Sequence, residues 1–232
     1  MQPKAWLNDI LNLFYPHICY ACGDSLTNQE NIICLSCELK LPRTGFHLHD
    51  DNPIARVFWG RVKLQAATSF LFFNKGGHVQ ELIHALKYKG KTETGVYLGK
   101  LFGMDLKNSP FYQNIDVVIP VPLHPKKFHK RGFNQSETIA KGISQSLGID
   151  IDHEHFIRLV NTDSQTKKSR YNRWENVKGV FGITDEKKLN GKHILLVDDV
   201  LTTGATLEAC ASVLLDIENT KVSVATLAYA QV

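Results

Sequence analysis

Residues 194–207, with the sequence ILLVDDVLTTGATL, decide the fold of this chain. The first four of them are apolar, which is typical of a buried strand in a parallel sheet. We expect this strand to end at two adjacent acids, Asp198 and Asp199, where a turn rich in Thr opens a helix that runs to about Leu215. Strand, acidic pair, turn and helix in this order predict a sugar-phosphate site at the carboxyl edge of a sheet.

The turn after the acids is suited to bind a phosphate group. Backbone N–H groups at a helix N-terminus attract anions, and Thr hydroxyl groups add further hydrogen-bond donors. Gly204 lets the backbone approach the anion closely. The residues that we expect around the phosphate are Thr202, Thr203, Gly204, Ala205 and Thr206.

The two carboxylates would repel a phosphate, so they must serve another part of the ligand. They can accept hydrogen bonds from the vicinal hydroxyl groups of a ribose, or lie near a cation. An ordinary strand–turn–helix unit with a chance Asp pair is the alternative interpretation. The complete pattern favours the sugar-phosphate site, and the segment resembles the phosphoribosyl diphosphate (PRPP) binding motif of type I phosphoribosyltransferases.

Length and composition limit the number of domains, the classes of ligand and the location of the protein. A chain of 232 residues can hold one α/β domain and a small extra module. The net charge of +4 is compatible with anionic ligands or nucleic acid and decides between neither. No apolar run approaches the ~20 residues of a membrane span. Near the N-terminus, polar residues interrupt the apolar ones, which indicates a short amphipathic helix and not an export signal, so we expect a cytoplasmic protein.

The cysteines near the N-terminus have the spacing of a metal site. Two Cys-x-x-Cys pairs, separated by eleven residues, consist of Cys19, Cys22, Cys34 and Cys37. Two such pairs complete a tetrahedral zinc site, and four sulfur ligands leave no open position for catalysis. Two disulfides or a redox pair are the alternatives. Structural zinc is the preferred interpretation, because a reducing compartment disfavours disulfides and a redox site needs only one pair.

Strands alternate with helices after the cysteine segment. We expect strands near residues 63–73, 116–121, 156–160, 192–198 and 221–228, and helices near residues 78–88, 92–106 and 133–147. This alternation predicts an α/β fold with a parallel sheet. We expect residues 1–50 to form an N-terminal helix and zinc module, and residues 54–232 to form the main domain. The composition of residues 41–53 predicts a linker between them.

A second loop follows the strand near residue 119. Pro120, Val121, Pro122 and Leu123 are expected to form a rigid loop, which leads into the cationic residues Lys126, Lys127, Lys130 and Arg131. No acid occurs between Asp116 and Glu137. At the carboxyl edge of the sheet, this cluster would suit a pyrophosphate leaving group, whereas a solvated basic loop is the alternative.

Three further stretches resemble one family. They are HALKYKG at residues 84–90, PVPLH at 120–124 with RGFNQ at 131–135, and residues 165–173 with the sequence QTKKSRYNR. With the PRPP motif and the four cysteines, they make the chain similar to the ComF family of competence-related proteins over nearly its whole length. The resemblance implies a type I phosphoribosyltransferase fold and a link to DNA uptake or the use of external DNA.

Carried onto this chain, the resemblance implies that Asp198 and Asp199 meet the ribose hydroxyls. Residues 202–206 would hold the 5′-phosphate, and residues 120–123 would face the pyrophosphate. Mg²⁺ would accompany PRPP, chelated by the oxygens of the substrate. Lys87 can also reach an anion and is a further candidate for binding PRPP. The apolar face of its helix accounts for the helical pattern without a functional role for Lys87.

Two functions from different classes remain. In the first, the chain is an enzyme that transfers ribose 5-phosphate from PRPP, with Asp198, Asp199 and Arg131 as the catalytic residues. In the second, it is a non-catalytic adaptor that binds single-stranded DNA and proteins of the uptake machinery. Residues that would contact nucleic acid are Lys126, Lys127, Lys130, Arg131, Lys167, Lys168, Arg170 and Arg173. The intact acidic pair favours the first, because a DNA groove gains nothing from two carboxylates.

Overall fold

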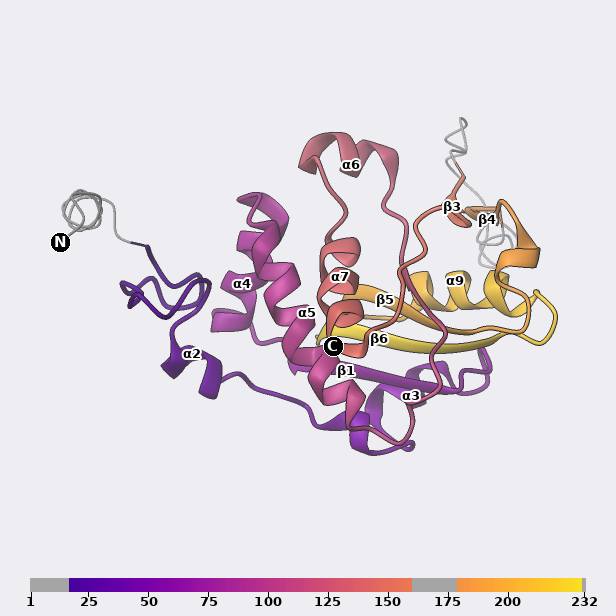
Figure 1. The fold of residues 1–232 in the computed structure, drawn as a ribbon, viewed down its shortest axis with the longest axis horizontal. Helices are drawn as coiled ribbons and strands as arrows, with labels where there is room; N and C mark the ends of the chain where they lie inside the picture. Colours follow the sequence, from indigo (N-terminus) through magenta and orange to yellow (C-terminus); the bar gives the residue numbers. More distant parts are fainter. Residues whose placement is uncertain (1–16, 160–178, 231–232) are drawn as a thin grey trace.

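A four-stranded parallel sheet forms the centre of the molecule. The computed structural model describes residues 17–159 and 179–230. Its strands are β1 (Ala66–Phe72), β2 (Val117–Pro120), β5 (His193–Leu201) and β6 (Lys221–Tyr229). Their spatial order is β1-β6-β5-β2, and every neighbouring pair is parallel, so the predicted α/β class is confirmed (Figure 1). In β5 the strand continues through the acidic pair to Leu201, three residues beyond the expected end.

Helices cover both faces of this sheet (Figure 1). One face packs against α4 (His78–Tyr88), α5 (Thr92–Lys107) and α7 (Gln135–Leu147), and the other against α3 (Pro53–Phe58) and α9 (Ala205–Leu215). Alternate residues of β5 pack into the hydrophobic cores on the two faces of the sheet. Leu195 and Val197 belong to the first core, whereas Ile194 and Leu196 belong to the second. This period of two explains why the strand is apolar on both faces.

Helices α5 and α7 approach each other closely through glycine. A methyl group on Gly99 of α5 would overlap the carbonyl oxygen of Ile139 in α7. A methyl group on Gly142 of α7 would overlap the carbonyl oxygen of Val96 in α5. Because neither residue has a Cβ, the two backbones can lie in contact, which fixes the position of α7 against the sheet.

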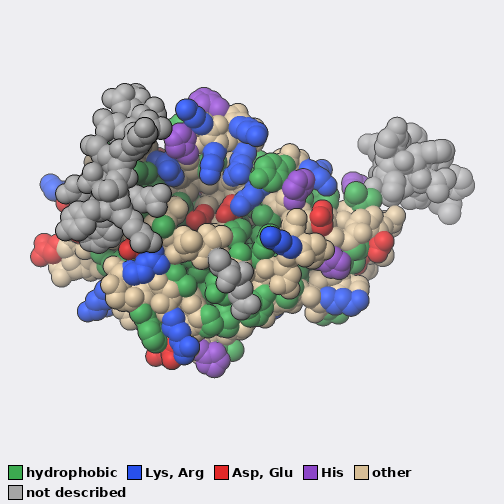
Figure 2. Space-filling model, turned by 180° about the vertical axis from the view of Figure 1, so that it is seen from behind, with side chains coloured by type: hydrophobic (Ala, Val, Ile, Leu, Met, Phe, Trp, Pro, Cys, Tyr) green, Lys and Arg blue, Asp and Glu red, His purple; other side chains and the backbone are tan. Residues whose placement is uncertain are grey.

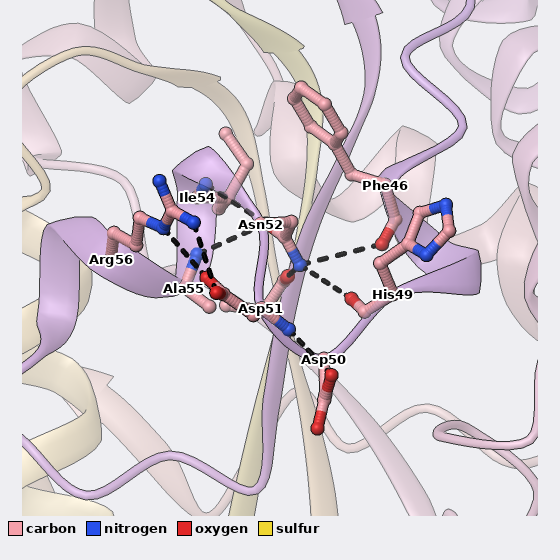
Figure 3. Close-up of polar contacts among 9 residues, drawn as sticks. Phe46, His49, Asp50, Asp51, Asn52, Ile54, Ala55 and Arg56 are labelled. Atoms are coloured by element: carbon pink, nitrogen blue, oxygen red, sulfur yellow. Dashed lines mark hydrogen bonds and ion pairs between the residues drawn. The ribbon is translucent and has the colours of Figure 1, made fainter.

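The segment before α3, which the sequence predicts as a linker, covers the free edge of β1. Arg43 forms an antiparallel bridge with Leu71, and a short 3₁₀ helix, η1 (Phe46–Leu48), follows. Figure 3 shows Asn52 at the centre of this segment, where its side-chain amide donates to the carbonyl oxygens of His49 at 2.8 Å and Ala67 at 2.9 Å. An uncovered edge strand would invite pairing with other chains, so this cover has a structural role.

The remaining elements surround the sheet. A separate antiparallel pair consists of β3 (Phe156–Arg158) and β4 (Phe181–Ile183). The shorter helices are α2 (Leu35–Leu39), α6 (Pro125–Arg131) and the 3₁₀ helix η2 (Glu186–Lys188). The N-terminal helix expected before residue 17, and the cations Lys167, Lys168, Arg170 and Arg173, lie outside the described residues. In the described part of the chain, no helix has the length and apolar character to cross a membrane.

Candidate functional site

Two loops and the acidic pair meet at the carboxyl edge of the sheet. In the strand register, Asp198 lies opposite Thr226 of β6, and Pro120 of β2 lies opposite Val197 of β5. Residues 120–123, here called the proline loop, therefore leave β2 directly beside Asp198. The backbone N–H of Val121 donates to the carbonyl oxygen of Val197 at 2.8 Å, which fixes the start of this loop. The structure thus brings together the proline loop and the acidic pair.

Asp198 is held by hydrogen bonds on one of its two oxygens. The Ser136 hydroxyl donates to Oδ1 at 2.8 Å, and the backbone N–H of Asp199 donates to the same atom at 2.8 Å. Burial, reinforced by the neighbouring charge of Asp199, raises the pKa of Asp198 from 3.8 to about 7. These hydrogen bonds and Lys87 act in the opposite direction and limit the rise.

Asp199 has a different partner. The ammonium Nζ of Lys87, at the C-terminal end of α4, lies 2.8 Å from Asp199 Oδ2. Both side chains are mostly buried, with 19% of the lysine and 16% of the aspartate side chain exposed. Lys87 therefore faces the acidic pair, and the described structure ties it to a carboxylate.

The predicted phosphate-binding turn, residues 202–206, is here called the phosphate loop. Together with Asp198 it lines a hollow of about 50 Å³. Gly204 caps the N-terminus of α9 with φ of +76°, a conformation that other residues adopt only with strain. A side chain there would also meet Val57 of α3 at 2.8 Å. Strand, loop and helix therefore have the arrangement that the sequence predicts.

The four cysteines of residues 19–37, here called the cysteine cluster, converge in space. Their Sγ atoms all lie within 4.8 Å of one another, and those of Cys22 and Cys34 are 3.9 Å apart. Four sulfurs bound tetrahedrally at ~2.3 Å from zinc would be ~3.8 Å apart. All four thiols are free of disulfides. The donor set and its spacing fit zinc.

The cysteine cluster is joined to the main domain by packing and hydrogen bonds. Cys19 and Cys37 belong to the same hydrophobic core as α4 and α5. The Tyr20 hydroxyl donates to Glu93 of α5 at 3.0 Å, and Tyr97 of α5 donates to Glu38 of α2. The segment therefore rests on the helix layer that carries Lys87.

The chain is similar to known proteins. The family model described as "Phosphoribosyl transferase domain" matches residues 132–231. DNA utilization protein YhgH of Escherichia coli O157:H7 is 34% identical over 206 residues, which cover 85% of this chain and 84% of that protein. The chain belongs to the ComF family.

Two further relatives of this ComF protein have names that refer to competence. Competence protein F of Haemophilus influenzae is 25% identical, over 87% of this chain and 92% of the relative, and competence protein ComFC of Bacillus subtilis is 28% identical, over 86% and 72%. Among solved structures, a hypoxanthine phosphoribosyltransferase from Staphylococcus aureus aligns with 60% of this chain and 64% of that chain, at 18% identity and a TM-score of 0.37.

Arg61 supports the phosphate loop of this ComF protein, although no local sequence pattern marks this residue. Its Nη1 donates to the carbonyl oxygens of Thr203 and Val57, both at 3.0 Å. Its Nη2 forms an ion pair with Glu208, in the first turn of α9. Arg61 therefore links α3 to the loop and to the helix that the loop opens.

The basic cluster after the proline loop is helical, not a loop. Pro125 at the first position and the side chain of His124 as cap explain why α6 forms. Lys126, Lys127 and Lys130 are exposed on it. Arg131 is instead bound to Gln135 at 2.6 Å and lies over the Tyr88 ring. Figure 2 shows basic side chains gathered along one rim of a hollow in which acidic side chains are visible.

A larger hollow, of about 660 Å³, is lined by other residues than those predicted for the site. It is lined by residues of α3, by the connection to β1 and by the start of β1, including Trp59 and Arg61. None of its lining residues belongs to the acidic pair, the phosphate loop or the proline loop. Volume alone does not identify the functional site, which is defined here by the converging polar groups.

Proposed function

We propose that this ComF protein binds PRPP with Mg²⁺ and transfers ribose 5-phosphate to a nitrogen nucleophile. The observation that carries the proposal is the convergence of the acidic pair, the phosphate loop and the proline loop at one sheet edge. In this assignment the phosphate loop holds the 5′-phosphate, and Asp198 and Asp199 accept hydrogen bonds from the ribose hydroxyls. The proline loop faces the diphosphate.

The reaction breaks the bond between C1 of the ribose and the diphosphate oxygen, and forms a bond from C1 to the nucleophile. The electron pair leaves with pyrophosphate, and the nucleophile loses a proton. Arg131 and the lysines of α6 offset the charge of the leaving group, and the acidic pair fixes the ribose while C1 becomes cationic. Mg²⁺ bound to the oxygens of PRPP would neutralise further charge on the diphosphate.

Three assignments accompany this function. The cysteine cluster holds a structural zinc ion, because its four sulfurs match the geometry and leave no open ligand position. Residues 1–50 form the zinc-binding unit, and residues 54–232 form the phosphoribosyltransferase-like domain. Free thiols and zinc thiolates persist in a reducing compartment, which supports a cytoplasmic location.

Calorimetric titration with PRPP and Mg²⁺ tests the proposal. Wild-type protein should bind, and the double variant Asp198→Asn with Asp199→Asn should lose about tenfold or more in affinity, since hydrogen bonds to charged groups contribute ~1.5–3 kcal/mol each. Pyrophosphate release in the presence of candidate nitrogen nucleophiles then tests turnover. Wild-type protein that fails to bind PRPP, or a double variant that binds it equally well, would contradict the assignment.

A second candidate function rests on α6. Three exposed lysines and Phe128, which is 47% exposed, lie on this helix. Cations and exposed aromatic rings are the features that bind single-stranded nucleic acid. A non-catalytic adaptor of the DNA-uptake machinery would use this surface, and would bind uptake proteins as partners. The names of the relatives refer to DNA utilization and competence, which fits this context.

Binding to an oligonucleotide at several salt concentrations separates the two functions. The adaptor predicts affinity for single-stranded DNA that falls as salt rises, with a smaller slope after Lys126→Ala, Lys127→Ala and Lys130→Ala are combined. Lys107→Ala, at an exposed lysine in the last turn of α5, is the control for the loss of a lysine from a helix end. An unchanged slope in the triple variant would contradict a role for α6.

A further inference from the structure

The Asp198 carboxyl group offers its two oxygens unequally. Oδ1 already accepts two hydrogen bonds, from the Ser136 hydroxyl and from the Asp199 backbone N–H, both at 2.8 Å. Oδ2 has no hydrogen-bond partner among residues 17–159 and 179–230. The two bonds at Oδ1 fix the orientation of the carboxylate. A ligand hydroxyl can therefore donate to Oδ2.

Ser136 is itself fixed by the proline loop. Asn134 caps α7, and its Oδ1 accepts from the Ser136 backbone N–H at 3.2 Å. The other end of the same amide, Nδ2, donates to the carbonyl oxygen of Val121 at 3.0 Å. All three residues are buried. The Asn134 side chain thus links the backbone of Ser136 to the loop assigned to the diphosphate.

We propose that Ser136 is a positioning residue that orients the Asp198 carboxylate toward the ribose and couples it to the proline loop. The inference rests on the proposed function. Ser136 does not touch the ligand in this assignment. Its hydroxyl acts through Asp198, because a hydrogen bond to the ionised form of an acid favours that form and fixes its rotamer.

Several charged or titratable groups face Asp198. Asp199 on β5 raises the pKa of Asp198, and Lys87 on α4 lowers it. On α9, the buried Cys210 has a pKa raised by burial and by the charge of Asp198, with Arg158 of β3 acting in the opposite direction. The Ser136 hydroxyl lowers the pKa of Asp198, so its removal should shift ionisation of that acid to higher pH.

Titration of PRPP and Mg²⁺ from pH 5.5 to 9 tests this role, with Ser136→Ala, Ser136→Thr and Asp198→Asn compared with wild type. Ser136→Ala should weaken binding about tenfold near pH 7 and move the pH midpoint of affinity upward. Ser136→Thr keeps the hydroxyl and should restore both. Asp198→Asn lacks the titrating acid, so the pH dependence of its affinity reports the titration of PRPP without that of Asp198.

Ser146→Ala is the matched control, because Ser146 lies in α7 like Ser136 and its hydroxyl donates to the carbonyl oxygen of Lys100 in α5. This variant should retain the wild-type affinity and the wild-type pH midpoint. Thermal unfolding shows that each variant is folded. Equal affinity of wild type and Ser136→Ala would overturn the inference, as would a loss that is uniform with pH or is not rescued by Thr. Wild-type protein that does not bind PRPP would instead contradict the proposed function.

Discussion

Two adjacent acids of the same type have different environments in this protein. Asp198 is hydrogen-bonded by a neutral hydroxyl from α7, whereas Asp199 is paired with the ammonium group of Lys87 from α4. Burial acts on Asp198 without a directly bound cation, so its pKa rises to about 7. The residues that distinguish the two acids come from helices distant in the sequence.

At this scale we predict that Asp198→Asn stabilises the ligand-free protein above pH 7. The folded-state pKa of Asp198 is raised from 3.8 to about 7, so its stabilising contribution, present at low pH, is lost as pH rises through this window. Asn can keep both hydrogen bonds at Oδ1 and has no charge to bury. The gain at pH 8 should be roughly 2–4 kcal/mol relative to pH 4, measured by chemical denaturation.

Asp150→Asn, at an exposed acid, is the control for the loss of one negative charge. An Asp198→Asn variant that is less stable than wild type at pH 8 would show that burial does not control this acid. A stability difference between variant and wild type that is the same at pH 4 and pH 8 would show the same.

At the scale of elements, the glycine contact between α5 and α7 places the N-terminus of α7, and with it Ser136, beside β5. We predict that Gly99→Ala destabilises the protein by about 2–3 kcal/mol, because overpacking a close backbone contact forces the helices apart. Helix propensity alone would favour Ala by up to ~1 kcal/mol. Denaturant unfolding measures the difference.

Gly179→Ala is the control, since no atom of the described residues, apart from its neighbours in the chain, lies within 4 Å of the added methyl group. A Gly99→Ala variant as stable as wild type would mean that the two helices can separate at no cost.

Elements with regular apolar patterns could be predicted from the sequence, and those defined by tertiary contacts could not. The strand at residues 194–197 and the helix at 78–88 follow from local periodicity, and both are confirmed. The α6 helix was missed because its residues are mostly cationic and show no apolar period. The composition of residues 41–53 predicts a linker but not its contact with β1, because the bond from Asn52 to Ala67 joins residues that are not local in the sequence.

The candidate site combines one contiguous segment with residues from other elements. Asp198, Asp199 and the phosphate loop are contiguous, so a single segment predicts them. Ser136 and Arg61 act on that segment from other elements, and neither has a local pattern that would single it out. Lys87 was predicted to reach an anion, and the structure adds that its partner is Asp199.

At the scale of the whole molecule, the cysteine cluster and the main domain share one hydrophobic core. We predict that removal of zinc by a chelator lowers the Tm of the whole chain, because metal binding supplies folding free energy to a segment joined to α4 and α5. Metal analysis should find one zinc ion per chain. Zinc, but not Mg²⁺, should restore the Tm.

Cys210→Ala is the control, because this cysteine lies in α9 outside the cluster, and the variant should keep its zinc. Protein prepared without chelators that contains no zinc, or a Tm that chelation leaves unchanged, would contradict the assignment.

In the proposed function, the acidic pair accepts hydrogen bonds from the ribose hydroxyls while the phosphate loop holds the 5′-phosphate. The most direct measurement is the ratio of affinities for ribose 5-phosphate and 2-deoxyribose 5-phosphate. Wild type should prefer the ribose form by about tenfold or more, because the deoxy sugar lacks a hydroxyl group that would donate to the acidic pair. The double variant Asp198→Asn with Asp199→Asn should lose this preference. Equal affinity of wild type for the two sugars would contradict the account.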